Sequence, residues 1–340
     1  MDPLYFNNAN PPSLIIPGPN GIELQTNDYM TLTCIGNGNT IIGTGQQELT
    51  VQCVSNNKLL YNGAKYDLKQ LYCSANSLSN VFFNGTPCSS GRGEIMHLGF
   101  NTPKGFFPQL YVCYDRSNEA SLYAVNTIYG KSITISERGR EDRPSFRTQG
   151  LTNAADTANQ YQQSSQKDRF SSLLGLVQTK KYIDNKSSYL ARGHLAPDAD
   201  FLLGSWSSAT YFYVNAVPQW QVINIRNWKR VENNARNVAN STKDDMTIFT
   251  GSYDVLQLLS DRNSMEDIFL FDVKKLRVPM WMWKIVYSQS TQLGIAFVTL
   301  NNPHATSVTP ICPDICASSG WSRTEFRVFA QGYTYCCDVN

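Results

Sequence analysis

Short apolar stretches alternate with turns that contain Gly and Asn between residues 21 and 105 of the chain. Runs of apolar, aromatic and β-branched residues that are bounded by such turns are typical of β-strands. The pattern predicts strands at 29–34, 49–54 and 81–83. Residues 1–20 are rich in Asn and Pro, and we expect them to form an extended arm. The sequence therefore predicts a small β-rich module with an arm over residues 1–105.

A boundary that contains Gly and Pro is expected at 105–108, and residues 106–340 then mix strand and helix patterns. The clearest helix is predicted at 223–239, where apolar residues recur every three or four positions and mark one buried face. A shorter helix is predicted near 167–177, after a loop at 148–168. Further strands are predicted at 110–114, 122–128, 188–195, 209–217, 247–255, 268–273, 280–287 and 293–300. The chain is therefore expected to belong to the α+β class.

Composition and charge limit the class of protein. The 340 residues are 41% apolar, 12% aromatic and 16% charged, which excludes a disordered protein. Lys and Arg number 29 against 27 Asp and Glu, so the net charge of +2 does not by itself indicate a nucleic-acid binder. Residues 160–240, however, hold ten Lys and Arg against five Asp and Glu. This basic surplus suits phosphate binding, and chance unevenness is the alternative.

The nine cysteines lie near the two ends of the chain, at 34, 53, 73, 88, 113, 312, 316, 336 and 337. A zinc site would need paired Cys and His clusters, and the chain has three His, so disulfides are the stronger interpretation. We expect the first four cysteines to cross-link the β-rich module. The odd number leaves at least one thiol unpaired or paired between chains.

Three sequons, at Asn84, Asn185 and Asn240, favour glycosylation and an oxidising, secretory route. The first thirty residues hold no apolar stretch that resembles a signal peptide, so we expect a secreted, extracellular chain whose leader is absent. No apolar run reaches transmembrane length, and a membrane partner is not expected.

The first stretch that can carry chemistry is Arg192-Gly193-His194, in the segment Tyr-Leu-Ala-Arg-Gly-His-Leu-Ala-Pro-Asp-Ala-Asp-Phe. A His that follows a Gly at the end of a strand is well placed to act as a general base, since Gly permits close approach of a substrate. The neighbouring Arg can hold a phosphate group. The tripeptide alone is a weak signal, because a buried structural His is the common alternative.

A second stretch strengthens this interpretation. Asn215-Ala-Val-Pro-Gln219 follows the His by twenty-one residues, and Asn224, Glu232 and Arg236 come next. An Asn at the start of a helix can give an oxygen to a hard cation or can simply cap the helix. Glu232 can accept hydrogen bonds from metal-bound waters or face solvent. Arg236 can pair with Glu232, one turn away, or reach a phosphate.

These two blocks, in this order and at this spacing, resemble the DNA/RNA non-specific endonuclease family, which has a ββα-metal site. The cysteine layout and the Leu-Ala-Pro-Asp-Ala-Asp-Phe continuation resemble most its secreted arthropod members, which prefer duplexes or degrade double-stranded RNA. The resemblance covers about 106–340 and implies a mixed α/β nuclease domain with a central antiparallel sheet. It implies a Mg²⁺ cofactor, with Mn²⁺ or Ca²⁺ as substitutes.

The resemblance also implies a role for each matching residue. His194 would activate water as the general base, Asn224 would be the direct metal ligand, and Glu232 would hold the metal-bound waters. Arg192 and Arg236 would contact substrate phosphates, and Asn215 would order the site near the base. The family also has an upstream Arg that stabilises the transition state. Arg143 is the candidate, and its rivals are Arg138, Arg140 and Arg147.

The implied activity is hydrolysis of phosphodiester bonds in DNA or RNA with little sequence specificity, leaving 5′-phosphate ends. Double-stranded substrates are favoured, while the choice of nucleic acid and the oligomeric state stay open. Many bacterial members have Asp where this chain has Ala191, so a non-catalytic nucleic-acid-binding relative is the alternative. Asp198 or Asp200 can take the place of that Asp. A third hypothesis is an extracellular recognition protein that binds through residues 21–105.

Overall fold

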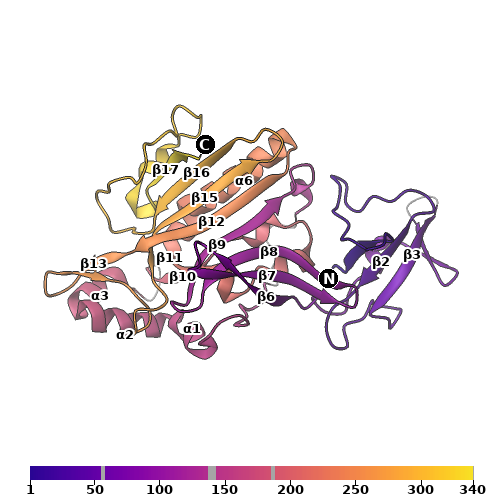
Figure 1. Ribbon diagram of the computed structural model, residues 1–340, viewed down its shortest axis with the longest axis horizontal. Coiled ribbons are helices and arrows are strands. Elements are labelled where there is room, and N and C mark those ends of the chain that lie inside the picture. Colours follow the sequence, from indigo (N-terminus) through magenta and orange to yellow (C-terminus); the bar gives the residue numbers. More distant parts are fainter. Residues whose placement is uncertain (55–57, 137–142, 185–187, 340) are drawn as a thin grey trace.

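The computed structural model describes residues 1–54, 58–136, 143–184 and 188–339. Two sheets dominate it; in Figure 1 the smaller one lies at the right and the larger one runs from the centre to the upper left. The smaller sheet has five antiparallel strands in the order β1-β2-β3-β4-β5, with β1 at Leu4–Asn7, β2 at Tyr29–Thr33, β3 at Glu48–Val54, β4 at Lys58–Tyr61 and β5 at Ala64–Tyr66. Leu49, Val51 and Cys53 alternate with exposed or half-buried residues along β3, so this sheet buries one face. The 3₁₀ turn η1 follows at Leu68–Gln70.

The larger sheet has eight antiparallel strands in the order β17-β16-β15-β12-β9-β8-β7-β6. Their bounds are β6 Asn80–Cys88, β7 Gly93–Thr102, β8 Gly105–Asp115, β9 Ala120–Ile128, β12 Met246–Val255, β15 Pro279–Ser288, β16 Gly294–Leu300 and β17 Thr334–Asp338. The boundary expected at 105–108 falls inside β8, because β6 and β7 pair with β8 rather than with the small sheet. The β-rich module with its own apolar cluster ends near Cys73.

Most of the helices lie in the part of the sequence between β9 and β12. They are α1 Ala154–Gln160, α2 Gln163–Leu174, α3 Leu176–Tyr182, α4 Gly204–Ser208, α5 Gln221–Ile223 and α6 Lys229–Thr242, with short turns η2 Ile133–Ile135, η3 Asp198–Asp200, η4 Tyr213–Asn215, η5 Asn224–Trp228, η6 Thr324–Arg327 and η7 Phe329–Gln331. Two small ribbons complete the fold: β10 Leu190–His194 with β11 Ala216–Trp220, and β13 Gln257–Leu259 with β14 Met265–Asp267.

Three expected elements differ from those observed. Residues 148–168 contain α1 and the start of α2 rather than a continuous loop, residues 209–215 form turns before β11, and residues 268–273 form no strand. Polar residues dominate the exposed faces of α1 and α2, which concealed their helical period.

One face of the large sheet packs on α6 (Figure 1). Val231 and Ala235 from α6 share an apolar cluster with Ile248 of β12 and Met282 of β15. The opposite face has a smaller cluster, with Trp281, Val298 and Tyr335, under the chain that leads to the C-terminus. The helix is therefore held against strands that come later in the sequence.

Four disulfides join Cys34–Cys73, Cys88–Cys113, Cys312–Cys337 and Cys316–Cys336, and Cys53 is a buried free thiol. The expectation that the first four cysteines cross-link the module is therefore wrong in part, because Cys88 connects β6 to β8 in the large sheet.

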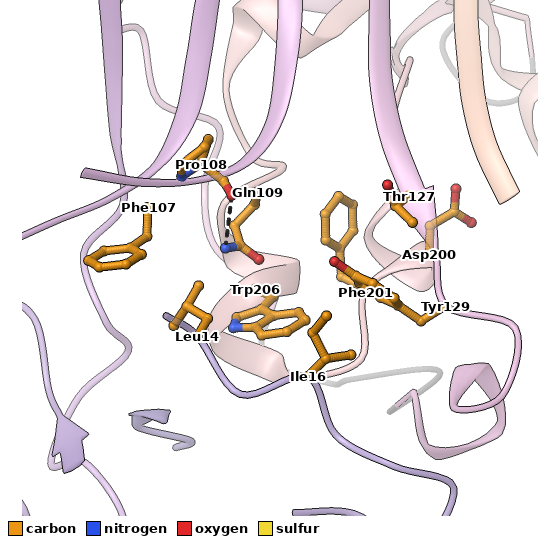
Figure 2. A pocket seen from close by; sticks show the side chains of 10 residues that line it. All are labelled: Leu14, Ile16, Phe107, Pro108, Gln109, Thr127, Tyr129, Asp200, Phe201 and Trp206. Atoms are coloured by element: carbon orange, nitrogen blue, oxygen red, sulfur yellow. Dashed lines mark hydrogen bonds between the residues drawn. The ribbon is translucent and has the colours of Figure 1, made fainter. Parts of the chain in front are cut away.

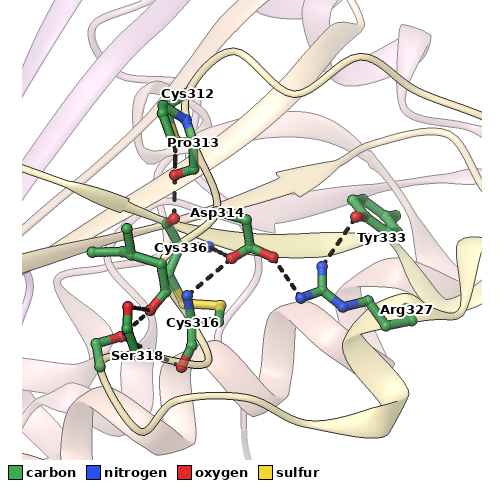
Figure 3. A network of polar contacts seen from close by, with 10 residues as sticks. Cys312, Pro313, Asp314, Cys316, Ser318, Arg327, Tyr333 and Cys336 are labelled. Carbon is green, nitrogen blue, oxygen red and sulfur yellow. Dashed lines mark hydrogen bonds and ion pairs between the residues drawn. A yellow bond between two sulfur atoms is a disulfide. The ribbon is translucent and has the colours of Figure 1, made fainter.

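The C-terminal disulfides lie in a polar network (Figure 3). Asp314 Oδ1 accepts hydrogen bonds from the backbone N–H groups of Cys316 and Cys336 at 3.0 and 3.2 Å, and Arg327 pairs with its other oxygen. Both cysteines are oxidised to a disulfide, so this cluster offers no thiolates to a zinc ion.

The module is attached to the half that contains the large sheet through β1 and the arm. Leu4 and Phe6 are fully buried in the large cluster, whereas Tyr5 between them faces the module's own cluster. Figure 2 shows that Leu14 and Ile16 of the arm border a cavity of about 330 Å³, with Trp206 in its wall and Asp200 at one side. The two halves thus share a buried junction. In the part of the chain described here, no helix is long and apolar enough to cross a membrane.

Candidate active site

The ribbon of β10 and β11 presents His194 at its end. His194 pairs with Ala216, and Gly193 pairs with Val217. A side chain at Gly193 would meet the buried Gln219, whose Oε1 and Cβ lie 2.5 and 2.7 Å from an ideal Cβ position. Gly193 is therefore required because Gln219 fills the space beside it.

Asn215 fixes the turn that follows His194. Its Oδ1 accepts a hydrogen bond from the Ala196 N–H at 3.0 Å, and its Nδ2 donates to the carbonyl oxygens of Ala196 and Thr210, both at 2.9 Å. Its backbone oxygen accepts from the Leu195 N–H at 2.9 Å. Asn215 is fully buried, so it can order the site but cannot touch a substrate.

His194 opens onto a cleft of about 760 Å³. Arg143, Arg192 and Asn224 line the same cleft, so four of the residues that the sequence singled out surround one space. Aromatic side chains form much of its wall: Phe146, Tyr161, Tyr189, Tyr211 and Tyr213. Two cationic side chains beside a histidine give the cleft the charge that a phosphodiester requires.

Aromatic rings hold the imidazole of His194. The ring centres of Phe146 and Tyr211 lie 4.8 and 4.9 Å from that of His194. The guanidinium carbon of Arg192 lies 5.1 Å from the centre of the Phe146 ring, and Arg192 Nη1 donates to the Tyr213 hydroxyl at 3.3 Å. Phe146 therefore supports both the His and the Arg of the first motif.

The pKa of His194 is lowered to about 4, mainly because the ring is buried away from water. The Asp198 carboxylate opposes this shift, while Arg143 and Arg192 add to it. The imidazole is consequently neutral at physiological pH, which is the protonation state that can accept a proton.

Asp198 lies close enough to His194 for each group to influence the pKa of the other. Its Oδ2 accepts a hydrogen bond from the Tyr211 hydroxyl at 2.6 Å and lies 3.8 Å from Arg143 Nε. The pKa of Asp198 is lowered, since these partners and His194 outweigh burial. An ionised carboxylate thus faces His194 although position 191 is Ala.

The helix predicted at 223–239 is observed as three joined pieces, α5, the π-helical turn η5 and α6. Arg226 departs from helical geometry, with φ −112° and ψ −105°. Irregular turns of this kind inside helices are common at functional sites. Asn224 begins η5 and donates from Nδ2 to Gln221 Oε1 at 3.4 Å, and it makes no helix-capping bond.

Glu232 lies on α6 near four other charged groups, Arg236, Lys284, Asp200 and Asp198. Burial raises the pKa of its carboxyl to about 7, although Arg236 and Lys284 act to lower it. Arg236 and Lys284 therefore do not fully offset the cost of burying the ionised carboxylate of Glu232.

Arg236 differs from its expected place. It is 4% exposed, its Nη1 donates to Asp200 Oδ1 at 2.6 Å, and its Nη2 donates to Asn233 Oδ1 at 2.8 Å. Neither Arg236 nor Glu232 lines the cleft that holds His194. A direct contact of Arg236 with a substrate phosphate does not fit this burial, and the ion pair to Asp200 gives it a positioning role instead.

The two upstream arginines that the structure describes, Arg143 and Arg147, differ in their surroundings. Arg143 is exposed and borders the cleft. Arg147 instead donates to the Ser79 and Ser208 carbonyl oxygens at 2.6 and 3.0 Å and stacks over Phe212, so it holds the backbone together. Arg138 and Arg140 lie outside the described residues.

Sequence reasoning missed two parts of this site. Tyr211, which orients Asp198, and Lys284, which lies beside Glu232, stand in stretches that look like ordinary strand or core. A single Lys among the apolar residues of 280–287 is the one signal that pointed to a buried polar role.

The chain is similar in sequence to several known proteins. Residues 91–340 match the family described as DNA/RNA non-specific endonuclease. A salivary endonuclease of Lutzomyia longipalpis is 31% identical over 99% of this chain and 78% of its own length. The salivary protein Tsal1 of Glossina morsitans morsitans is 27% identical over 92% of this chain and 77% of its own.

A salivary endonuclease of Culex quinquefasciatus is 27% identical over 80% of this chain and 74% of its own length. Among solved structures, a chain of the EndoG/EndoGI inhibitory complex aligns with a TM-score of 0.39 and 17% identity, over 66% of this chain and 84% of that one.

Proposed function

Because this chain belongs to the DNA/RNA non-specific endonuclease family and is an endonuclease, we propose that it cuts polynucleotides in the cleft beside His194. The single observation that carries the proposal is the convergence of His194, Arg143 and Arg192 on one cleft. A neutral base and two cations within one space match what attack on a negatively charged phosphodiester needs.

His194 removes a proton from water, and the water oxygen then forms a bond to phosphorus as the bond to the 3′ oxygen breaks. The products carry a 5′-phosphate and a 3′-hydroxyl, the latter protonated by solvent. Asp198 stabilises the positive charge that His194 gains. Arg143 and Arg192 bind the phosphate oxygens, and Arg143 stabilises the extra charge of the transition state.

The family is metal-dependent, and we propose Mg²⁺ as the cofactor, with Mn²⁺ or Ca²⁺ able to substitute. Two observations fit a hard cation with its waters. Among the described residues, Asn224 Oδ1 accepts no hydrogen bond, and the nearby cations do not fully offset the cost of burying the ionised carboxylate of Glu232. Asn224 would be the direct ligand and Glu232 would hold the waters. When bound, the cation supplies positive charge next to the scissile phosphate.

Since the attacking group is water, the reaction does not involve the 2′-hydroxyl, and both DNA and RNA are substrates in this proposal. We propose that duplexes are preferred, as in the secreted arthropod enzymes that the motifs resemble. Asn215 holds the turn after His194 in place through its bond to Ala196, and Arg236 holds the turn η3 in place through its ion pair with Asp200.

We also propose that the protein is secreted, which is supported by four disulfides and by the salivary relatives. Asn84 is exposed on β6, and its Oδ1 accepts hydrogen bonds from the N–H and hydroxyl of Thr86, so the first sequon is accessible to a glycan. Asn240 lies near the end of α6, and Asn185 is outside the described residues.

Digestion of single- and double-stranded DNA and RNA, each with Mg²⁺ and with chelator, tests the proposal. Wild-type protein is expected to cut with Mg²⁺, while His194→Ala and Asn224→Ala lose about 100-fold or more in rate. His97→Ala is the matched control, because His97 lies in β7 away from the cleft. Binding without cleavage would favour the non-catalytic alternative, and full activity of His194→Ala would contradict the mechanism.

A further inference from the structure

Lys284 of the large sheet lies on a buried strand face whose neighbouring side chains are apolar. Lys284 lies in the middle of β15, is 0% exposed, and shares its face of the strand with the buried Met282 and Val286. A buried ammonium group costs several kcal/mol unless it is paired and hydrogen-bonded. Its presence in this core therefore calls for partners that compensate it.

The contacts of Lys284 reach three separate elements. Its Nζ donates to the hydroxyl of Thr250, the residue directly opposite on β12. It also donates to the carbonyl oxygen of Leu195 at 3.4 Å, and Leu195 follows His194. Finally, Nζ lies 5.5 Å from the ring centre of Trp228, the last residue of the turn that begins with Asn224.

Three charged side chains lie close enough to Lys284 to influence its pKa: Asp200, Glu232 and Arg236. Burial lowers the pKa of Lys284 and Arg236 adds to this shift, while Asp200 and Glu232 favour the charged form. Arg236 is already committed to Asp200 and Asn233. Arg236 and Lys284 both favour the ionised form of Glu232, and Lys284 is the one of the two whose ammonium group also contacts the turn after His194.

We propose that Lys284 is a positioning residue that joins the turn after His194 to the helix of Asn224 and Glu232 and serves as the counter-ion of Glu232. The inference rests on the proposed function, in which those two segments must face the same phosphate. A displacement of about 1 Å in such an arrangement can lower a rate by about 100-fold. Lys284 touches neither substrate nor cation, so it acts through these neighbours.

Lys284→Met tests this role, because Met has a similar length and fits an apolar core. We expect a fall of about ten-fold or more in kcat with little change in KM, and an acidic limb of the pH–rate profile that moves to higher pH. The limb moves because Glu232, which faces Arg236, Asp200 and Asp198 as well, loses one of its two cations. Lys284→Arg keeps the charge and should restore the position of the limb.

The pH dependence of stability gives a readout that needs no activity. The pKa of Glu232 is raised in the folded protein, so its contribution to stability is present at low pH and is lost as pH rises through about 7. In Lys284→Met this loss should move to higher pH, and the further change Glu232→Gln should abolish it. Met282→Leu, on the same face of the same strand, is the matched control and should behave as wild type.

The outcomes are distinct. Unchanged kcat and an unchanged acidic limb in Lys284→Met would overturn the inference, and so would a loss of rate with both pH profiles unmoved, since that is a purely structural effect. If Lys284→Met does not fold, Thr250→Val decides, because it removes only the hydroxyl acceptor; a reduced kcat supports the role and an unchanged one rejects it. A wild-type protein that cuts no substrate would instead contradict the proposed function itself.

Discussion

His194 and Glu232 differ in pKa in opposite directions from their ordinary values. Burial lowers the pKa of His194 to about 4 and raises that of Glu232 to about 7. A neutral imidazole can accept a proton, whereas an ionised carboxylate can accept hydrogen bonds from metal-bound waters. In the proposed mechanism both forms are needed and they coexist above about pH 7, so we expect Glu232 to limit activity on the acidic side.

The first prediction concerns this acidic limb. Activity should fall as pH drops through the pKa of Glu232, and the limb should move to lower pH as Mg²⁺ is raised, because a nearby cation favours the carboxylate. Rates measured over pH at several Mg²⁺ concentrations test this. Glu232→Gln should lower the rate and remove the limb, and it should raise Tm at pH 8, since it removes a charge whose burial cost the nearby cations do not fully offset. A limb near pH 4 that ignores Mg²⁺ would point to His194 instead.

The second prediction concerns the buried pair of Arg236 and Asp200. Arg236→Met leaves the Asp200 carboxylate buried without its partner, and we expect a loss of about 3–5 kcal/mol in the free energy of unfolding. Arg230→Met, which removes a partly exposed arginine from the same helix, is the control. Urea unfolding measures both. Equal small losses would show that the Arg236 pair contributes no more than a surface one.

For single residues, the sequence predicted which side chains belong to the site better than it predicted the side chains that they contact. The two motif blocks singled out His194, Arg192 and Asn224, which the structure brings to one cleft. Asp200 as the partner of Arg236, and Lys284 as a neighbour of Glu232, depend on contacts between distant segments. Periodicity and spacing describe only local structure, so such pairs could not be predicted from them.

Among the elements, the helix predicted at 223–239 was placed well, since α5, η5 and α6 span Gln221 to Thr242. The π-helical turn at Asn224–Trp228 was not predicted. The apolar pattern of Val231 and Ala235 lies on α6, after this turn, so it gives no information on the helical geometry before it. The sequence thus predicted the helix but not the irregular turn that presents Asn224.

The third prediction compares how much two disulfides, Cys88–Cys113 and Cys34–Cys73, stabilise the half of the molecule that contains the large sheet. The Cys88–Cys113 bridge links β6 to β8, and its removal by paired substitution to Ala should cost about 2–4 kcal/mol. All six Trp residues lie at or after position 206, so tryptophan fluorescence reports on the nuclease half alone. Removal of Cys34–Cys73 should move the fluorescence midpoint in urea much less, because that bridge closes the small module. Equal shifts would contradict this division.

On the scale of the whole molecule, β1 belongs to two cores. Its Phe6 packs in the nuclease core while Tyr5 packs in the module. Strand alternation made this possible, because neighbouring side chains point to opposite faces. The boundary at 105 could not have been corrected from sequence, since β6 and β7 carry the same apolar pattern as the module strands and differ only in their pairing partners.

The fourth prediction follows from this shared strand. Phe6→Ala should lower the urea midpoint of tryptophan fluorescence, with a loss of about 3–5 kcal/mol, although the residue belongs to the module's sheet. Leu32→Ala on the neighbouring strand is the control, because Leu32 packs only in the module's cluster. A larger effect of Leu32→Ala on the fluorescence would show that the module does not couple to the nuclease core in this way.

The free thiol of Cys53 offers a way to measure opening of the small module. The thiol is buried in β3, in the module's apolar cluster, and all other cysteines are oxidised in the part of the chain described here. A thiol-specific reagent can therefore label the native protein only when that small sheet opens. The labelling rate would show how often the module loosens while the nuclease half stays folded, and whether a bound polynucleotide slows that opening.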